Sequence, residues 1–320
     1  MPYKAYYQLQ SEPFSNAPMT RFYFSSPQHE QTLRKLRYAL DNRKGLAVCT
    51  GSIGAGKTTL ARRLLDSLPD GEFEAALLVI VHSEIPANWL LKRIALQLGV
   101  REPSPEKLTL LSQLYRRLLQ IHERGKKAVV LIDEAQMLRS RDVMEELRGL
   151  LNLEIPDTKL ITFVLFGLPD IDETLRIDEP LRQRVAVRSI LRPLDGASCA
   201  AYIRHRLALA GAASPLFSNE ALDEIYTCSG GVPRLVNTLC DNVLFEGSLL
   251  KRPLLDATLV REVARELNLF SAAPSMAPSF PAPAKEKETD RPAPAAKPKN
   301  QASPIELEAF DRLLKELDRY

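Results

Sequence analysis

The chain of 320 residues has few cysteines, few histidines and no long apolar run. Its four cysteines form no C-x-x-C pair and its four histidines show no metal-ligand spacing, so we expect reduced, mostly buried thiols and no zinc site. The longest apolar runs fall well short of the ~20 residues that a membrane helix needs, and no secretory signal opens the sequence. A net charge of only +3 gives no strong case for nucleic acid. We therefore expect a cytoplasmic globular protein.

One stretch matches the phosphate-binding pattern G-x-x-x-x-G-K-[ST] without a mismatch. Glycines in this pattern let consecutive backbone N–H groups turn inward around phosphate oxygens. Lys57 is expected to reach the β- and γ-phosphates, and the Thr58 hydroxyl is expected to ligate Mg²⁺. The predicted nucleotide-binding residues are Gly51, Ser52, Ile53, Gly54, Ala55, Gly56, Lys57, Thr58 and Thr59.

The flanks of this loop agree with that interpretation. Residues 45–50 form a short apolar run of strand length, and residues 59–68 have apolar side chains at helical spacing. The helix that opens at Lys57 would point its positive dipole end at the bound anion. A phosphate-binding loop must lie between a strand and a helix, and this order is present. The alternative is a glycine turn in an unrelated α/β protein.

A second motif supplies acidic residues. The apolar run 128–132 is typical of a strand buried on both faces of a parallel sheet, and it ends in Asp133 and Glu134. Asp133 would hold the magnesium shell, and Glu134 would orient and polarise the attacking water, because phosphoryl transfer is catalysed mostly by positioning and charge stabilisation. The alternative is that both acids only begin a solvated turn and cap the next helix.

Strands alternate with helices over the first part of the chain. We expect strands at 45–50, 75–81, 128–132, 159–167 and 187–191. We expect helices at 28–43, 59–68, 87–98, 106–124 and 139–153. The first 27 residues, rich in proline and aromatic residues, are expected to wrap onto the core as an irregular arm. This alternation predicts an α/β fold with a five-stranded parallel sheet and helices on both faces. Together with the glycine loop, it indicates a P-loop NTPase.

The pattern changes towards the C-terminus. From residue 195 the apolar spacing is helical only, at 197–210, 219–228, 232–245 and 256–268, which predicts a small all-helical lid domain. Residues 271–303 contain seven prolines and nine alanines, a composition typical of a disordered linker. The sequence therefore predicts an ATPase domain with its arm at 1–194, a lid at 195–270, this linker, and a last segment at 304–320.

The last segment has the pattern of an amphipathic helix. Ser303 is a predicted N-cap, Pro304 follows at the first helical position, and apolar residues recur at helical spacing to Tyr320. A helix this short is marginal alone in water. We expect it to dock on a partner, on its own core or on a membrane surface, and a solvated tail without function is the alternative. Its mixed charges disfavour the membrane.

Several blocks together resemble the AAA+ ATPases of the ExeA or general secretion pathway protein A type. They are Glu12-Pro13-Phe14, Arg21-Phe22-Tyr23, Ser26 and His29, Thr58-Thr59-Leu60, Leu131-Ile132-Asp133-Glu134-Ala135-Gln136, Pro180-Leu181-Arg182-Gln183-Arg184-Val185, and Gly230-Gly231-Val232-Pro233-Arg234-Leu235-Val236-Asn237. The resemblance covers about residues 6–250, and the last block is its most particular part.

The resemblance implies an Mg²⁺-dependent enzyme that hydrolyses ATP and assembles into a ring, often a hexamer. Arg234 would be the lid arginine that senses the γ-phosphate. Arg184 or its neighbour Arg182 would be the finger that reaches the ATP of a neighbouring subunit. A solvated helix face is the alternative for all three arginines.

Two departures from the family pattern bear on function. Leu168 stands where the family usually has a polar glutamine after the fourth strand, and leucine cannot hydrogen-bond a phosphate or a water. Secretion-type members also continue through a membrane span into a periplasmic peptidoglycan-binding region, and no such region is recognised in this sequence. We expect a partner to supply the membrane part, with residues 304–320 as a candidate contact.

Three functions remain open from the sequence. The first is a cytoplasmic ATPase that drives or regulates assembly of an envelope machine for secretion, pili or polysaccharide export, with a partner linking it to the inner membrane as an option. The second is a DNA-associated ATPase resembling transposition regulators. It is suggested by a local cluster of arginines, Arg182, Arg184, Arg188 and Arg192. The third is a nucleotide-dependent scaffold that barely hydrolyses ATP, suggested by Leu168.

Overall fold

The computed structural model describes residues 2–17, 19–156 and 158–269. These residues belong to one compact unit of the chain. The linker predicted over 271–303 and the helix predicted over 304–320 lie outside the described residues, so both stay predictions.

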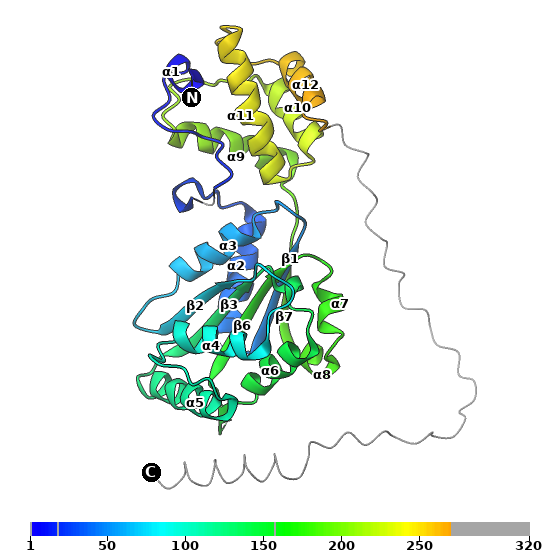
Figure 1. Cartoon of the computed structure of the whole chain (residues 1–320). Helices are drawn as coiled ribbons and strands as arrows, with labels where there is room; N and C mark the ends of the chain where they lie inside the picture. Colours follow the sequence, from blue (N-terminus) through cyan, green and yellow to red (C-terminus); the bar gives the residue numbers. More distant parts are fainter. Residues whose placement is uncertain (1, 18, 157, 270–320) are drawn as a thin grey trace, which may run out of the picture. The chain divides into compact units, whose positions relative to one another are not determined.

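A five-stranded parallel sheet forms the centre of the α/β part, as the sequence predicts (Figure 1). Its strands are β1 (Leu46–Gly51), β2 (Phe73–Val79), β3 (Lys127–Asp133), β6 (Ile161–Gly167) and β7 (Val185–Leu191). They lie in the order β2-β3-β6-β1-β7. This order puts β6 between the strand that precedes the glycine loop and the strand that ends in the acidic pair. The carboxyl ends of all three therefore meet at one edge of the sheet.

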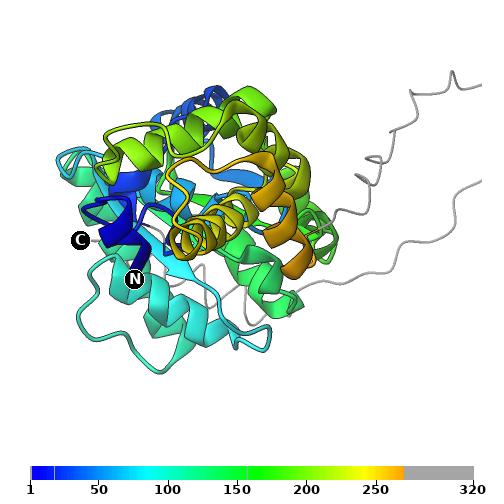
Figure 2. The same ribbon diagram turned by 90° about the horizontal axis from the view of Figure 1, so that it is seen from above.

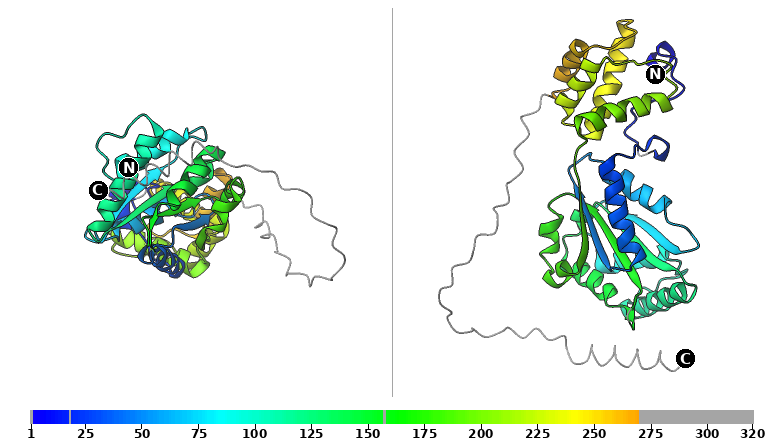
Figure 3. Two further views of the ribbon diagram at one scale, coloured as in Figure 1. Left: turned by 90° about the horizontal axis from the view of Figure 1, so that it is seen from below. Right: turned by 180° about the vertical axis from the view of Figure 1, so that it is seen from behind.

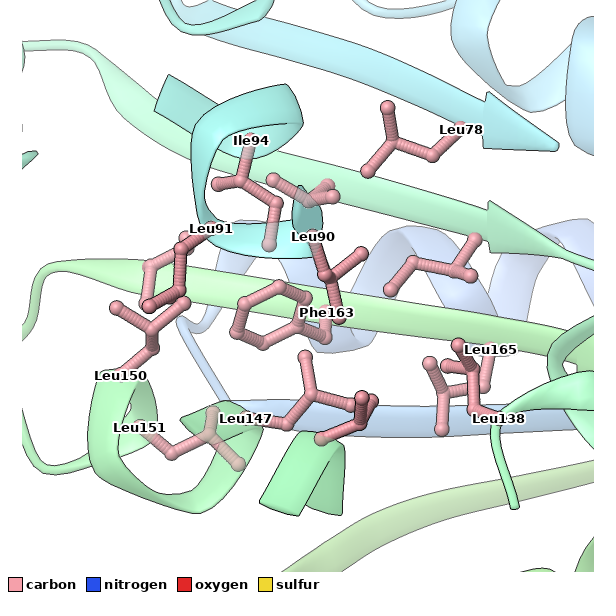
Figure 4. Close-up of a cluster of buried hydrophobic side chains, with 14 of the residues drawn as sticks. Leu78, Leu90, Leu91, Ile94, Leu138, Leu147, Leu150, Leu151, Phe163 and Leu165 are labelled. Carbon is pink, nitrogen blue, oxygen red and sulfur yellow. The ribbon is translucent and has the colours of Figure 1, made fainter. Parts of the chain in front are cut away.

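Helices cover both faces of the sheet because its central strands are buried on both sides. On one face, Phe163 and Leu165 of β6 pack against α4 (Ala87–Gln97) and α6 (Arg141–Leu151), with α5 (Lys107–Glu123) in the same core cluster (Figure 4). On the other face, their neighbours Val164 and Phe166 pack in a cluster with α2 (Pro27–Asp41) and α3 (Lys57–Asp66). Figure 3 (right) shows α2 lying across this second face.

Several short elements escaped the sequence prediction. A two-stranded hairpin, β4 (Glu154–Ile155) with β5 (Thr158–Lys159), precedes β6. Helices α7 (Ile171–Leu175) and α8 (Glu179–Gln183) lie between β6 and β7. Five residues are too few to display a helical period, although α8 does carry an N-cap, since the Asp178 side chain accepts from the Leu181 N–H.

Four helices form the all-helical part: α9 (Gly196–Leu209), α10 (Asn219–Ser229), α11 (Pro233–Leu249) and α12 (Ala257–Glu266). Asp195, Ser218 and Asp256 each cap a helix by accepting a backbone N–H three residues on. These caps explain why the helix starts agree with the sequence prediction. Viewed from above, these helices lie together, with the N-terminal α1 (Pro2–Tyr6) beside α11 (Figure 2).

The N-terminal arm is more ordered than predicted, and the expectation of an irregular segment was wrong for α1 and for the 3-10 turn η1 (Thr20–Phe22). The Tyr3 hydroxyl donates to the Asp241 carboxylate at 2.5 Å, and the Tyr7 hydroxyl donates to the Arg252 carbonyl at 3.0 Å. Tyr3, Phe14 and Phe22 share one buried cluster with α9 to α12. The aromatic residues of the arm therefore form part of the core of the helical part.

We predict opposite effects for alanine at two helical glycines. At Gly247 a methyl group would collide with Leu255 and with the Tyr7 hydroxyl, whereas at Gly149 it would meet nothing within 4 Å. Gly247→Ala should lower the free energy of unfolding by about 1–3 kcal/mol through overpacking. Gly149→Ala, the matched control, should raise it by roughly 0.5–1 kcal/mol because alanine favours the helix. Urea unfolding followed by circular dichroism measures both, and shifts of the same sign would contradict the packing described for Gly247.

Candidate active site

The glycine loop joins the end of β1 to the start of α3. Gly54 and Gly56 have φ angles of 77° and 98°, in the left-handed region where side chains are disfavoured. A methyl group at Gly54 would also approach the Arg234 Cβ to 2.8 Å. The loop therefore needs glycine both for its backbone conformation and for the close approach of the helical part.

The side chain of Lys57 folds back into the glycine loop that precedes it. Its side chain is 6% exposed, and its Nζ donates to the carbonyls of Gly51 at 2.8 Å and Ser52 at 2.9 Å. Burial lowers the pKa of the Lys57 ammonium, against the opposing effect of the Glu134 and Asp133 carboxylates. The ammonium is therefore held by neutral carbonyls, and an anion at the loop would be a stronger partner.

Thr58 and Asp133 bring the loop and β3 together. The Thr58 hydroxyl donates to Asp133 Oδ2 at 2.7 Å, and the Asp133 side chain is only 1% exposed. Burial raises the pKa of the Asp133 carboxyl, while hydrogen bonds from the Thr58 hydroxyl and the Glu134 N–H oppose that shift. Two hard oxygen ligands thus lie side by side next to the loop.

The chemistry of this pair fits a magnesium ion. Among residues 2–17, 19–156 and 158–269 no group of three or more His, Cys, Asp or Glu side chains could enclose an ion. Mg²⁺ does not need one, because it usually keeps several waters and takes one or two protein oxygens together with substrate phosphates. A hydroxyl and a carboxylate beside a phosphate loop are such a set.

Glu134 follows Asp133 in a left-handed backbone conformation, with φ 56°. Its N–H donates to Asp133 Oδ1 at 3.0 Å. One of its carboxylate oxygens accepts from the Gln136 amide at 2.6 Å. Glu134 lines the same cavity as Lys57 and Thr58, so its carboxylate lies near the place where a bound phosphate would be.

Arg234 approaches the loop from the helical part. Its backbone N–H, near the start of α11, donates to the Gly54 carbonyl at 3.3 Å. The turn before it is fixed by the Gly231 carbonyl, which accepts from the Leu194 N–H at 2.8 Å. Gly231 has a φ of 70°, and a methyl group there would collide with the Leu194 carbonyl. The Gly-Gly-Val-Pro stretch therefore places Arg234 against the phosphate loop.

A cavity of about 470 Å³ runs from the loop to the arm and the helical part. On the loop side its lining includes Ile53, Gly54, Gly56, Lys57, Thr58, Thr59, Glu134 and Leu168. On the other side it includes Asn16, Tyr23, His29, Tyr202, Arg206, Arg234 and Asn237. Six of the nine predicted loop residues thus face the cavity. Gly51 and Ser52 act through their carbonyls, and Ala55 is buried beneath the loop.

Several residues of this cavity were not predicted as site residues, and among them are the buried side chains of His29 and Arg206. His29 Nδ1 lies 2.6 Å from the Ser26 hydroxyl, and burial lowers the pKa of His29 to about 4, so its ring is neutral at pH 7. Arg206 is 5% exposed and donates to the Tyr202 hydroxyl at 2.6 Å and the Ser15 carbonyl at 3.1 Å. His29 was part of the arm block that resembles the family. Nothing in the local pattern around Arg206 distinguished it from a solvated arginine.

Arg182 and Arg184 are not among the residues that line the cavity. Arg182 forms an ion pair with Glu179 at 2.6 Å. Arg184 donates to the Arg148 carbonyl at 3.3 Å and to the Asn152 side chain. The structure therefore brings Lys57, Arg234 and the acidic pair together, and it places these two arginines elsewhere on the same chain.

Comparison with known proteins shows which family the chain resembles. Residues 40–175 match the family described as AAA domain. The general secretion pathway protein A of Aeromonas hydrophila is 37% identical over 245 residues, which cover 76% of this chain. The chain spans 44% of the length of that relative.

Solved structures show the same fold at low identity. Cdc6p of Pyrobaculum aerophilum aligns with a TM-score of 0.60 at 20% identity, over 79% of this chain and 70% of its own. The ORC2 protein of Aeropyrum pernix, solved in complexes with ADPNP and ADP, aligns with a TM-score of 0.58 at 18% identity, over 80% and 72% of the two chains.

The sequence-based assignment is thereby confirmed for the family and for the fold class. Within the part of the chain that the structure describes, the helices are too short or too polar to cross a bilayer. The phosphate loop at the end of β1, the acidic pair at the end of β3 and the match to a secretion-pathway relative lead to one conclusion: the chain belongs to the AAA+ ATPases of the general secretion pathway protein A type.

Proposed function

We propose that this chain binds ATP with Mg²⁺ in the cavity beside the phosphate loop and hydrolyses it. The observation that carries the proposal is the contact of Thr58 with Asp133 beside the buried Lys57 ammonium. Bound Mg²⁺ would neutralise charge that develops on the phosphate oxygens. Thr58 would hold the ion directly, and Asp133 would hold it directly or through water.

Three residues of the chain would contact the phosphates or the attacking water. Lys57 would exchange its two carbonyl partners for phosphate oxygens, a charge-assisted and therefore stronger pairing. Glu134 would orient the attacking water and accept its proton. Arg234 would contact the γ-phosphate, so that the helical part responds to hydrolysis through the contact of α11 with Gly54.

Arg184 is the better candidate for a finger that acts on a neighbouring subunit. Arg182 is already paired with a carboxylate, Glu179. The described contacts of Arg184 are to a carbonyl and to the neutral Asn152 amide. Redirecting Arg184 towards a phosphate would therefore cost less than redirecting Arg182. A ring in which each subunit completes the site of the next follows from this assignment.

We propose that the ATPase drives or regulates assembly of a bacterial envelope machine through a protein partner. The support is the similarity to a general secretion pathway protein over 76% of this chain. Residues 304–320 are the proposed contact with this partner. The DNA alternative has less support in the structure, because Arg182 and Arg188 are ion-paired with Glu179 and Asp172.

Glu134→Gln should separate binding from hydrolysis. The amide keeps the size of the side chain but cannot accept a proton, so ATP affinity should stay within about twofold while kcat falls by roughly 10²–10⁴-fold. Calorimetry with Mg²⁺ and ATP measures affinity, and phosphate release measures turnover. Lys57→Ala is the control and should lose ATP binding itself. Wild-type turnover in Glu134→Gln would refute the role assigned to Glu134.

Arg184→Ala should reduce hydrolysis only where the protein self-associates. At protein concentrations that favour oligomers, the variant should lose ~10³-fold in kcat, the effect expected of a finger supplied in trans. At high dilution it should match wild type. Arg188→Ala is a matched control, since it removes an arginine of the same region that pairs with Asp172. An equal loss at every concentration would rule out a role between subunits.

Deletion of residues 304–320 should abolish capture of the partner without changing ATP affinity. The bait is the Glu134→Gln variant saturated with ATP, because a stalled ring holds its partners longer. Secretion, pilus or export components among the captured proteins support the envelope function. Salt-sensitive, ATP-stimulated binding of the full chain to duplex DNA would instead support the alternative. Identical capture by the full and shortened chains would exclude the terminal segment as the contact.

A further inference from the structure

Gln136 connects Glu134 to the turn after β6. Its Nε2 donates to the Glu134 carboxylate at 2.6 Å, and its Oε1 accepts from the Leu168 N–H at 3.1 Å. The side chain is 4% exposed, so both ends of the amide are satisfied inside the protein. A single buried side chain therefore links Glu134, the residue after β3, to the turn that follows the neighbouring strand β6.

The chemistry of the two partners decides which way this amide points. A backbone N–H can only donate, so the amide oxygen must face Leu168. An ionised carboxylate can only accept, so the amide NH₂ group must face Glu134. The opposite orientation would put two donors against each other and two acceptors against each other. Glutamine therefore supplies the donor and the acceptor that this bridge needs.

The neighbouring residues leave room for this bridge. A methyl group at Gly167 would lie 2.9 Å from Gln136 Oε1 and 3.0 Å from the Ile171 Cδ1. Glycine at the end of β6 therefore allows the amide to reach the Leu168 backbone. Leu168 lines the cavity with a side chain that cannot bond a phosphate, but its N–H still takes part in the bridge.

We propose that Gln136 is a positioning residue for ATP hydrolysis: it holds the Glu134 carboxylate in one orientation by anchoring it to the turn after β6. This inference rests on the proposed role of Glu134 in orienting water. The connection runs through the backbone of residue 168, which is why a leucine side chain is tolerated there. The turn after β6 and the acidic end of β3 then move as one unit beside the phosphate loop.

The first test replaces Gln136 by methionine, which keeps the length and removes both hydrogen bonds. We expect kcat to fall by roughly 10–100-fold, because a freed carboxylate occupies the productive geometry only part of the time. The affinity for ATP with Mg²⁺, measured by calorimetry, should change by less than about threefold. Thr174→Val is the matched control, since it removes the hydroxyl that donates to the Gln136 carbonyl at 3.4 Å and leaves the amide in place. It should keep wild-type kcat.

The second test has a readout that a purely structural role would not move. In Gln136→Glu a second carboxyl group faces Glu134, and two close carboxylates favour sharing one proton. The protonated acid can then donate to its partner, as the amide does. We expect kcat of this variant, relative to wild type, to rise as the pH falls from 8 to 6. The kcat of Gln136→Met, relative to wild type, should not rise over the same pH range.

Gly167→Ala tests the same Gln136 bridge by a substitution at the end of β6. The added methyl group displaces the amide while both of its polar partners remain, so kcat should fall with little change in ATP affinity. Thermal unfolding of each variant checks that the fold persists. Wild-type kcat in Gln136→Met, or a loss confined to ATP affinity, would overturn this inference alone. Absence of ATP hydrolysis by the wild-type protein would instead overturn the proposed function, and this inference with it.

Discussion

The structure depends on one constraint, the meeting of the carboxyl ends of β1 and β3 at a single edge of the sheet. The hydrogen bond from Thr58 to Asp133 joins these ends, and the Lys57 ammonium lies buried beside it on neutral carbonyls. Keeping a cation and a carboxylate out of water is costly unless strong partners are supplied. A phosphate with a magnesium ion would supply both partners at once, so the ligand proposed for this site would offset the cost of burying these charges.

The second feature that defines the site is the packing of the N-terminal arm against the helical part. Tyr3 and Phe14 are buried among α9 to α12, although more than 180 residues separate them from α9 in the sequence. Ser26, near the end of the arm, hydrogen-bonds to His29 of α2, and His29 lines the cavity beside the phosphate loop. The cavity is therefore lined by elements from both ends of the folded unit, and Arg234 brings the start of α11 to it.

Much of this could be predicted from the sequence where the information is local. The glycine loop, the strand ending in Asp133 and Glu134, and the long amphipathic helices each have patterns that a few adjacent residues display. The short helices α7 and α8 and the hairpin before β6 have too few residues to show a period. The contacts of Gln136 with Leu168 and of Arg206 with Ser15 were likewise hidden, because these partners are distant in the sequence.

The sequence by itself determined the kind of chemistry, since the phosphate loop and the acidic pair require only residue identity and spacing within one strand, loop and helix. The tertiary structure decided which side chains share that site: that Gln136 holds Glu134, that Arg234 reaches Gly54, and that Arg182 and Arg184 lie away from the cavity. The physical reason is that strand order and helix packing set these distances, and both result from the burial of the whole apolar core rather than from any local pattern.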